Sequence, residues 1–129
     1  MVKVIPPRLV EPYLAGQRSV IAGYVYRASD CSFRTPADYY QALALGYEGS
    51  EFSAGMAELF VLRWIALDMS ASLVAGPRAS GSPVSVIPEF FTLPVPIPVG
   101  AEMGRVTFGG EEFIARYDGQ AWLRPLREA

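Results

Sequence analysis

Two short glycine-containing turns near the C-terminus constrain the fold of this chain more than any other feature of its sequence. Residues 105–124 read RVTF-GG-EEFIARY-DG-QAWLR, three β-prone runs separated by two turn dipeptides. Gly-Gly and Asp-Gly are typical of tight hairpins, because type I′ turns need positive φ at both central residues. The pattern predicts a three-stranded antiparallel meander. The residues expected to face inward are Val106, Phe108, Phe113, Ala115, Tyr117 and Trp122.

Two earlier segments are predicted to be buried strands. SVIAGYVYR (19–27) and AELFVLRWIAL (57–67) carry β-branched and aromatic residues on both faces, which favours central strands. A third segment, VSVIPEFFTLPVPIPVG (84–100), is β-rich but contains four prolines. Proline donates no ladder hydrogen bond, so this segment is expected at a sheet edge.

One short helix is predicted at residues 36–45. Thr35 and Asp38 have the spacing of a capping box, and Pro36 suits the first helical turn. Gly46 is expected to take the left-handed conformation that often ends a helix. Together with the strands, this helix predicts the α+β class: a mostly antiparallel β-sheet with one short helix and a C-terminal three-stranded meander.

The N-terminal segment is predicted to be an arm on a single domain of residues 1–129. Residues 1–19 contain three prolines and a glycine in VIPPRLVEPYLAGQRS, which argues against a central strand there. An arm with little internal pairing is usually mobile unless something holds it. Residues 1–12 would therefore suit docking to a partner protein or to a second copy of the chain in a homo-oligomer.

The composition excludes several classes of function. The net charge is −2, which argues against nucleic-acid binding, and no apolar run is long enough to span a membrane. The absence of histidine removes His-dependent triads and His-bearing metal motifs, so no metal is expected. The single cysteine, Cys31, allows no internal disulfide and fits a cytoplasmic protein. No signal peptide is recognisable, so delivery or secretion by another route is the alternative.

The segment VYRASDCSFRTPADYYQALALGY (25–47) resembles the opening of ADP-ribosyltransferase toxins of the cholera and pertussis type. Those domains open with a strand ending in Tyr-Arg, a nearby aspartate, an Arg-x-Pro element, a short helix and a Gly-aromatic pair. The matching residues here are Tyr26, Arg27, Asp30, Arg34, Pro36, Gly46 and Tyr47. The resemblance implies an NAD-binding domain of a toxin or effector, or a degenerate relative of one. Its activity would be ADP-ribosyl transfer or NAD hydrolysis.

The same resemblance assigns roles to five residues. Arg27, with Tyr26 beside it, would hold the pyrophosphate side of NAD, because a guanidinium matches phosphate in a bidentate fashion. Ser70 and Ser72 in MSAS would supply the strand-borne serine motif. Glu89 in IPEFFTL would be the catalytic glutamate, which bonds the ribose and stabilises an oxocarbenium-like transition state.

Simpler interpretations of these charged and polar residues stay open. Arg27 would then be a strand-end arginine that reaches water or pairs with Asp30 or Asp38. Glu89 would be an exposed residue beside Pro88, and the serines would be loop or cap residues. Elsewhere, Arg63 lies between apolar residues and should pair with a carboxylate such as Glu58 or Asp68, whereas Glu111-Glu112 is expected to be a solvated pair.

Two further function classes therefore stand beside the NAD-binding one. The first is a non-catalytic interaction or assembly protein, such as a subunit of a larger particle or an immunity or adaptor module. The second is a small-molecule-binding β-rich domain with an aromatic cleft. The aromatic residues considered for such a cleft are Tyr24, Tyr26, Tyr39, Tyr40, Phe60 and Trp64, which are expected first of all in the core.

Overall fold

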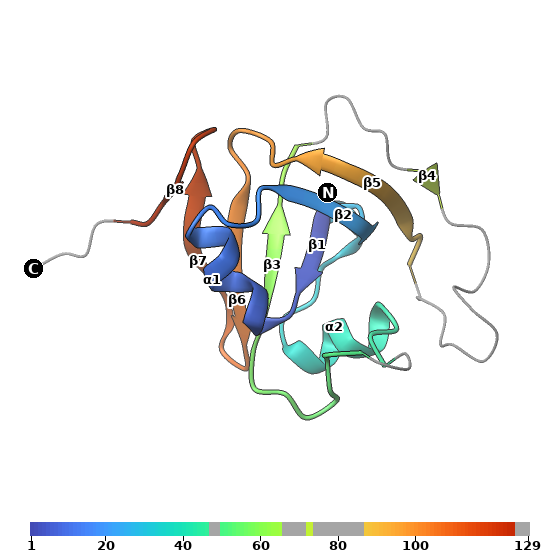
Figure 1. The fold of residues 1–129 in the computed structure, drawn as a ribbon. Helices are drawn as coiled ribbons and strands as arrows, with labels where there is room; N and C mark the ends of the chain where they lie inside the picture. Colours follow the sequence, from blue (N-terminus) through green and yellow to red (C-terminus); the bar gives the residue numbers. More distant parts are fainter. Residues whose placement is uncertain (47–49, 66–71, 74–86, 126–129) are drawn as a thin grey trace, which may run out of the picture.

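Two antiparallel sheets and two short helices make up the fold in the computed structural model, which describes residues 1–46, 50–65, 72–73 and 87–125 (Figure 1). The five-stranded sheet has the order β1-β3-β6-β7-β8 and the three-stranded sheet the order β2-β5-β4. The strands are β1 (Val2–Ile5), β2 (Val20–Val25), β3 (Leu59–Arg63), β4 (Ser72–Leu73), β5 (Phe90–Pro96), β6 (Glu102–Thr107), β7 (Gly110–Tyr117) and β8 (Trp122–Leu123). The predicted α+β class is confirmed.

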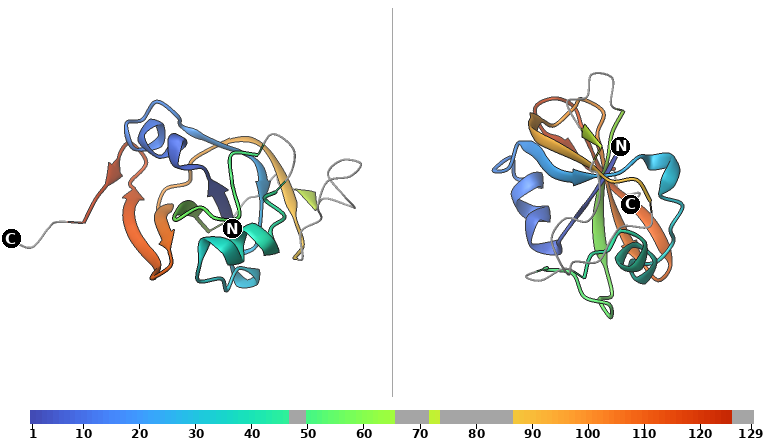
Figure 2. Two further views of the ribbon diagram at one scale, coloured as in Figure 1. Left: turned by 90° about the horizontal axis from the view of Figure 1, so that it is seen from below. Right: turned by 90° about the vertical axis from the view of Figure 1, so that its right-hand side faces the viewer.

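A helix covers each face of the five-stranded sheet, and two core clusters result (Figures 1 and 2). Helix α1 (Val10–Leu14) contributes Tyr13 to the cluster that contains Phe60 and Leu62 of β3. Helix α2 (Pro36–Ala42) contributes Tyr39 to the cluster formed by the alternate β3 residues, Leu59 and Val61. Strand β3 is therefore buried on both faces, as its uninterrupted apolar run predicts.

The expected N-terminal arm is instead part of the fold. Strand β1 pairs with β3 and is bridged to Tyr26 at the end of β2, and Val2 and Ile5 are fully buried. The prolines do not prevent this pairing, because Pro6 and Pro7 follow the strand and begin the short 3₁₀ turn Pro7–Leu9. Helix α1 comes next, so the chain has a second short helix where the sequence predicted irregular structure.

The C-terminal meander forms, but its first turn is displaced by one residue from the predicted position. Thr107 pairs with Gly110, so the turn consists of Phe108 and Gly109, and Phe108 is 69% exposed. A register shift between Met103 and Gly104 changes which side chains of β7 point toward the core, and Phe113 is exposed as well. Placing these two phenylalanines inward was therefore wrong, whereas Val106, Ala115 and Trp122 are buried as predicted.

The proline-containing segment lies inside its sheet rather than at the edge. Strand β5 pairs with β2 on one side and with β4 on the other. Its internal proline, Pro94, falls where the register with β2 shifts between Ile21 and Gly23, so it interrupts no regular ladder. None of the helices in the described part of the chain has the length and apolarity needed to cross a membrane.

Helix α2 begins with the predicted capping box. The Thr35 hydroxyl accepts from the Asp38 N–H at 3.3 Å, and the Asp38 carboxylate accepts from the Thr35 N–H at 3.2 Å. Hydrogen bonding of the Asp38 carboxylate with the Thr35 hydroxyl and with the Thr35 N–H lowers the pKa of Asp38. At the other end the prediction was wrong, because the left-handed residue is Ala44 (φ 54°) and not Gly46. Gly46 is instead packed against the Tyr40 hydroxyl, where a Cβ would clash.

We expect Thr35→Ala to lower the free energy of unfolding by about 1 kcal/mol, because the helix loses a capping acceptor. Thr35→Ser keeps the hydroxyl and serves as the matched control, with stability close to that of the wild type. Urea denaturation measures both variants. Equal stabilities for the alanine and serine variants would contradict a contribution from this cap.

Candidate functional site

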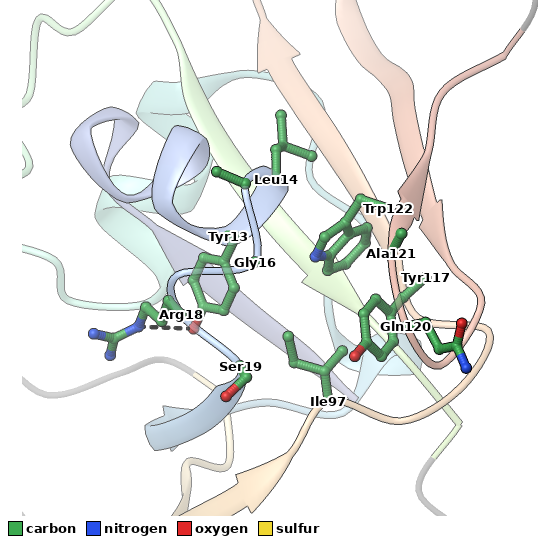
Figure 3. Close-up of a pocket in the computed structure, with 11 residues that line it drawn as sticks. Tyr13, Leu14, Gly16, Arg18, Ser19, Ile97, Tyr117, Gln120, Ala121 and Trp122 are labelled. Atoms are coloured by element: carbon green, nitrogen blue, oxygen red, sulfur yellow. Dashed lines mark hydrogen bonds between the residues drawn. The ribbon is translucent and has the colours of Figure 1, made fainter.

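A cavity lies between α1, the loop after it and the β7–β8 hairpin (Figure 3). Its volume is about 220 Å³. Its lining combines apolar and aromatic side chains with the polar residues Arg18, Ser19 and Gln120. The lining residues are Tyr13, Leu14, Ala15, Gly16, Arg18, Ser19, Ile97, Tyr117, Gln120, Ala121 and Trp122, which we call the Trp122 pocket.

Backbone hydrogen bonds fix the loop that forms one wall of the Trp122 pocket. The N–H groups of Gln17 and Arg18 both donate to the Pro12 carbonyl, at 2.9 and 3.0 Å. The N–H of Gly16 donates to the Tyr13 carbonyl, and Gly16 has a φ of +76°, which only glycine adopts without strain. The chain therefore reverses tightly after α1 and returns Arg18 to a position beside Tyr13.

The Tyr13 hydroxyl organises the polar side of the pocket. It donates to the Val20 carbonyl at 3.0 Å and accepts from Arg18 Nε at 3.2 Å (Figure 3). The Arg18 guanidinium also lies over the Tyr13 ring, with its carbon 5.5 Å from the ring centroid. Tyr13 itself is fully buried, so it is a rigid support for the arginine.

Trp122 forms the opposite wall and carries a hydrogen-bond donor without a partner. Its backbone pairs with Tyr117, and the two ring centroids lie 5.3 Å apart. Trp122 is 9% exposed, and its Nε1 exposes less than 1 Å² and has no hydrogen-bond acceptor. Figure 3 shows this nitrogen turned toward the Tyr13 side of the pocket. Buried donors of this kind are rare, and each costs about 1–3 kcal/mol.

Tyr26 and Glu89, to which the toxin resemblance assigns roles, contact each other outside the Trp122 pocket. The Tyr26 hydroxyl donates to Glu89 Oε2 at 2.6 Å, although 63 positions separate the two residues. Both are buried, with Tyr26 2% and Glu89 8% exposed, so Glu89 does not have the exposed position that the simpler interpretation expected. A cavity of about 140 Å³ lies beside Tyr26, with Lys3 and Phe52 among its lining residues.

Arg27 has contacts of its own. Its Nε lies 3.2 Å from Asp30 Oδ2, and its guanidinium carbon lies 5.4 Å from the centroid of the Phe90 ring. The ion pair with Asp30 is the local pairing that the sequence left open. Of the two serines, Ser70 lies outside the described residues. Ser72 lies in β4, and its backbone pairs with that of Phe91 in β5.

A third cluster surrounds Arg63. Its guanidinium donates to both carboxylate oxygens of Glu111 and, at 2.9 Å, to the Tyr39 hydroxyl. Gly104 makes this possible, because a Cβ there would lie 3.0–3.1 Å from side-chain atoms of Glu111. Glu111 is therefore an ion-pair partner and not part of a solvated pair. The expected partner Glu58 binds Arg105 instead.

Burial controls the titration of the groups next to Arg63. It raises the pKa of the Cys31 thiol to about 11, although the Arg63 charge acts in the opposite direction. It raises the pKa of the Tyr39 hydroxyl to about 12 in the same way. Cys31 is 5% exposed, and we expect its thiol to stay protonated and unreactive at neutral pH.

Sequence reasoning missed the centre of the Trp122 pocket. Trp122 was correctly expected to face inward, but the prolines around Tyr13 hid α1, and no pattern placed Arg18 beside Tyr13.

Within the described ranges, no group of three or more His, Cys, Asp or Glu residues is arranged to hold a metal ion. Comparisons of the chain with protein-family models, curated proteins and solved structures found no match.

We expect the stability to fall between about pH 9 and pH 11 as the buried Cys31 thiol ionises. The pKa of the Cys31 thiol is raised in the folded state. The stabilisation by the protonated thiol is therefore complete below the pKa of the unfolded state, and it is lost as the pH rises toward the pKa of the folded state. Between pH 8 and about pH 10.5, the free energy of unfolding of Cys31→Ala should fall by about 2 kcal/mol less than that of the wild type. Urea midpoints at the two pH values measure this difference, and parallel losses would contradict it.

Proposed function

We propose that the chain is a small-molecule-binding domain whose ligand occupies the Trp122 pocket. The observation that carries this proposal is the buried Trp122 N–H without an acceptor, in a residue that lines an aromatic cavity. A ligand oxygen or nitrogen that accepts from this group would remove the cost of leaving it unpaired. The aromatic residues involved are Tyr13, Tyr117 and Trp122, and not the set first considered from the sequence.

The size and lining of the pocket indicate the scale of the ligand. A cavity of roughly 150 Å³ is enough to bind benzene, and the Trp122 pocket measures about 220 Å³. It therefore accommodates one ring with a polar substituent. Ile97, Tyr117 and the indole of Trp122 provide the apolar surface for such a ring, and the N–H provides a directional contact.

Binding requires a small movement of the β7–β8 hairpin. Because Trp122 Nε1 is fully covered, an acceptor reaches it only when a neighbouring side chain shifts. Strand β8 is two residues long and pairs only through Leu123 and Trp122 with β7, so a shift there disrupts few backbone hydrogen bonds. We therefore expect β8 to move when a ligand binds and α1 to keep its position.

Benzamide, a neutral ring with a carbonyl acceptor, tests this proposal by NMR of the two tryptophan indole N–H signals. We expect benzamide at millimolar concentration to move the Trp122 signal downfield, because its N–H gains an acceptor, and to leave the Trp64 signal in place. Trp122→Phe and Trp64→Phe are a matched pair that assigns the two signals. An unchanged Trp122 signal, with benzamide and with other single-ring acceptors, would refute the proposal.

A second candidate function is NAD binding of the ADP-ribosyltransferase type. The contact between Tyr26 and Glu89 favours it, since the sequence resemblance assigned both residues to one site. Arg27 lies over Phe90, the neighbour of Glu89 in the chain, and so belongs to the same region. Against this, Arg27 already has Asp30 as an ionic partner, and NAD phosphates would have to compete with it.

Calorimetry with NAD tests the second candidate. If Arg27 holds the pyrophosphate, NAD binds the wild type, and Arg27→Ala weakens this binding by about 2–5 kcal/mol because a charge-assisted pair is lost. Glu89→Gln should spare binding and remove NAD hydrolysis or transfer. Arg34→Ala is the control, since it removes another arginine of the same segment. A flat titration of the wild type would exclude NAD as the cofactor.

A further inference from the structure

We propose that the ligand of the Trp122 pocket donates a hydrogen bond as well as accepting one, and that the hydroxyl oxygen of Tyr117 receives it. The class of ligand is then a neutral single-ring compound that carries both groups, such as a ring amide. This inference rests on the proposed function and names the class of ligand. It follows from the hydrogen bonds that the polar groups of the lining already make.

The hydroxyl protons of both tyrosines in the lining are already donated to backbone carbonyls. Tyr13 donates to Val20 at 3.0 Å, and Tyr117 donates to Gly119 at 3.2 Å. A phenol has one proton to donate, so neither tyrosine has a second proton for a ligand. Among the aromatic side chains of the pocket, the donor that a ligand meets is therefore Trp122 Nε1.

The two phenol oxygens differ in their capacity to accept. The Tyr13 oxygen already accepts from Arg18 Nε at 3.2 Å. No donor among the described residues reaches the Tyr117 oxygen, so its lone pairs are available to a ligand. Tyr117 is half-buried, and Figure 3 shows its hydroxyl pointing toward Ile97, which also lines the cavity.

Several other acceptors of the lining are already occupied. Four carbonyls accept from backbone N–H groups at 2.8–3.2 Å, namely those of Tyr13, Ser19, Tyr117 and Ala121 from Gly16, Ile97, Gly100 and Asp118, respectively. Ser19 and Gln120 also have polar side chains, but both residues are exposed, and a hydrogen bond there replaces one to water with little gain. The Tyr117 oxygen is thus the half-buried acceptor for a ligand donor.

The donor and the acceptor belong to neighbouring residues on one wall of the pocket. Tyr117 and Trp122 are paired across β7 and β8, and their rings lie at 48° to each other with centroids 5.3 Å apart. We expect one small ligand to contact both rings, with its carbonyl at the Trp122 N–H and its own N–H at the Tyr117 oxygen. Neither group is charged, so an ionised ligand would lose hydration without meeting an opposite charge at these two groups.

Benzamide and acetophenone test this inference, because a methyl group in acetophenone replaces the amide NH₂ while the ring and the carbonyl stay. We expect the wild type to bind benzamide about fivefold more tightly than acetophenone, since one further hydrogen bond forms. Titration of the Trp122 indole N–H signal measures both affinities. Tyr117→Phe keeps the ring and removes the acceptor. The NH₂ group of benzamide then loses its partner, and acetophenone should bind this variant at least as tightly as benzamide does.

Tyr24→Phe is the matched control, since it removes the hydroxyl of a tyrosine outside the pocket, and it should keep the preference for benzamide. A wild type that binds acetophenone as tightly as benzamide or more tightly, or a preference for benzamide that survives Tyr117→Phe, would overturn the inference while leaving the proposed function intact. Failure of both probes to move the Trp122 signal would overturn both.

Discussion

The backbone pair between Val2 and Tyr26 is the contact on which the rest of the structure depends. The Val2 N–H donates to the Tyr26 carbonyl at 2.7 Å, and the Tyr26 N–H donates back to the Val2 carbonyl at 2.8 Å. This bridge is where β1 of the five-stranded sheet meets the end of β2 of the three-stranded sheet (Figure 1). The Tyr26 side chain extends the junction, because its hydroxyl binds Glu89 just before β5. Residues of both sheets, among them Ile5 of β1 and Val25 of β2, therefore pack into one of the two core clusters.

The positions of the candidate sites follow from this junction. Because β1 lies inside the fold, the chain that follows it must return over one face of the five-stranded sheet, and α1 and its loop make that return. Tyr13 then lies across a cavity from the β7–β8 hairpin, with the Arg18 guanidinium on the far side of Tyr13 (Figure 3). Tyr26 and Glu89 lie at the junction itself. A buried tyrosine–carboxylate pair there stabilises the packing of the sheets, and this role needs no ligand.

The arginines of the described residues divide into those with a carboxylate partner and those without one. Arg63 lies across β6 from Glu111, where the missing side chain of Gly104 leaves room for their contact. An ion pair that is satisfied in this way has a structural role, and the pKa values of the neighbouring thiol and phenol are raised by burial. Arg18 has a tyrosine support and no acid, and Trp122 has a donor and no acceptor. Both residues line the Trp122 pocket.

The sequence by itself determined the local elements, and the tertiary structure decided which residues meet. Hydrophobic runs, the capping box at Thr35 and the glycine turns depend on neighbours in the chain, so the α+β class, β3, α2 and the meander were predictable. The role of β1 was not predictable, because prolines next to a strand lower its local propensity, whereas pairing partners 55 to 61 positions away in β3 restore it. The displaced turn at Phe108 and the bulge in β7 follow from register with β6, which no single run encodes. For the same reason the approach of Tyr13, Arg18 and Trp122 was decided only when the sheets and α1 packed together, since these residues come from opposite ends of the chain.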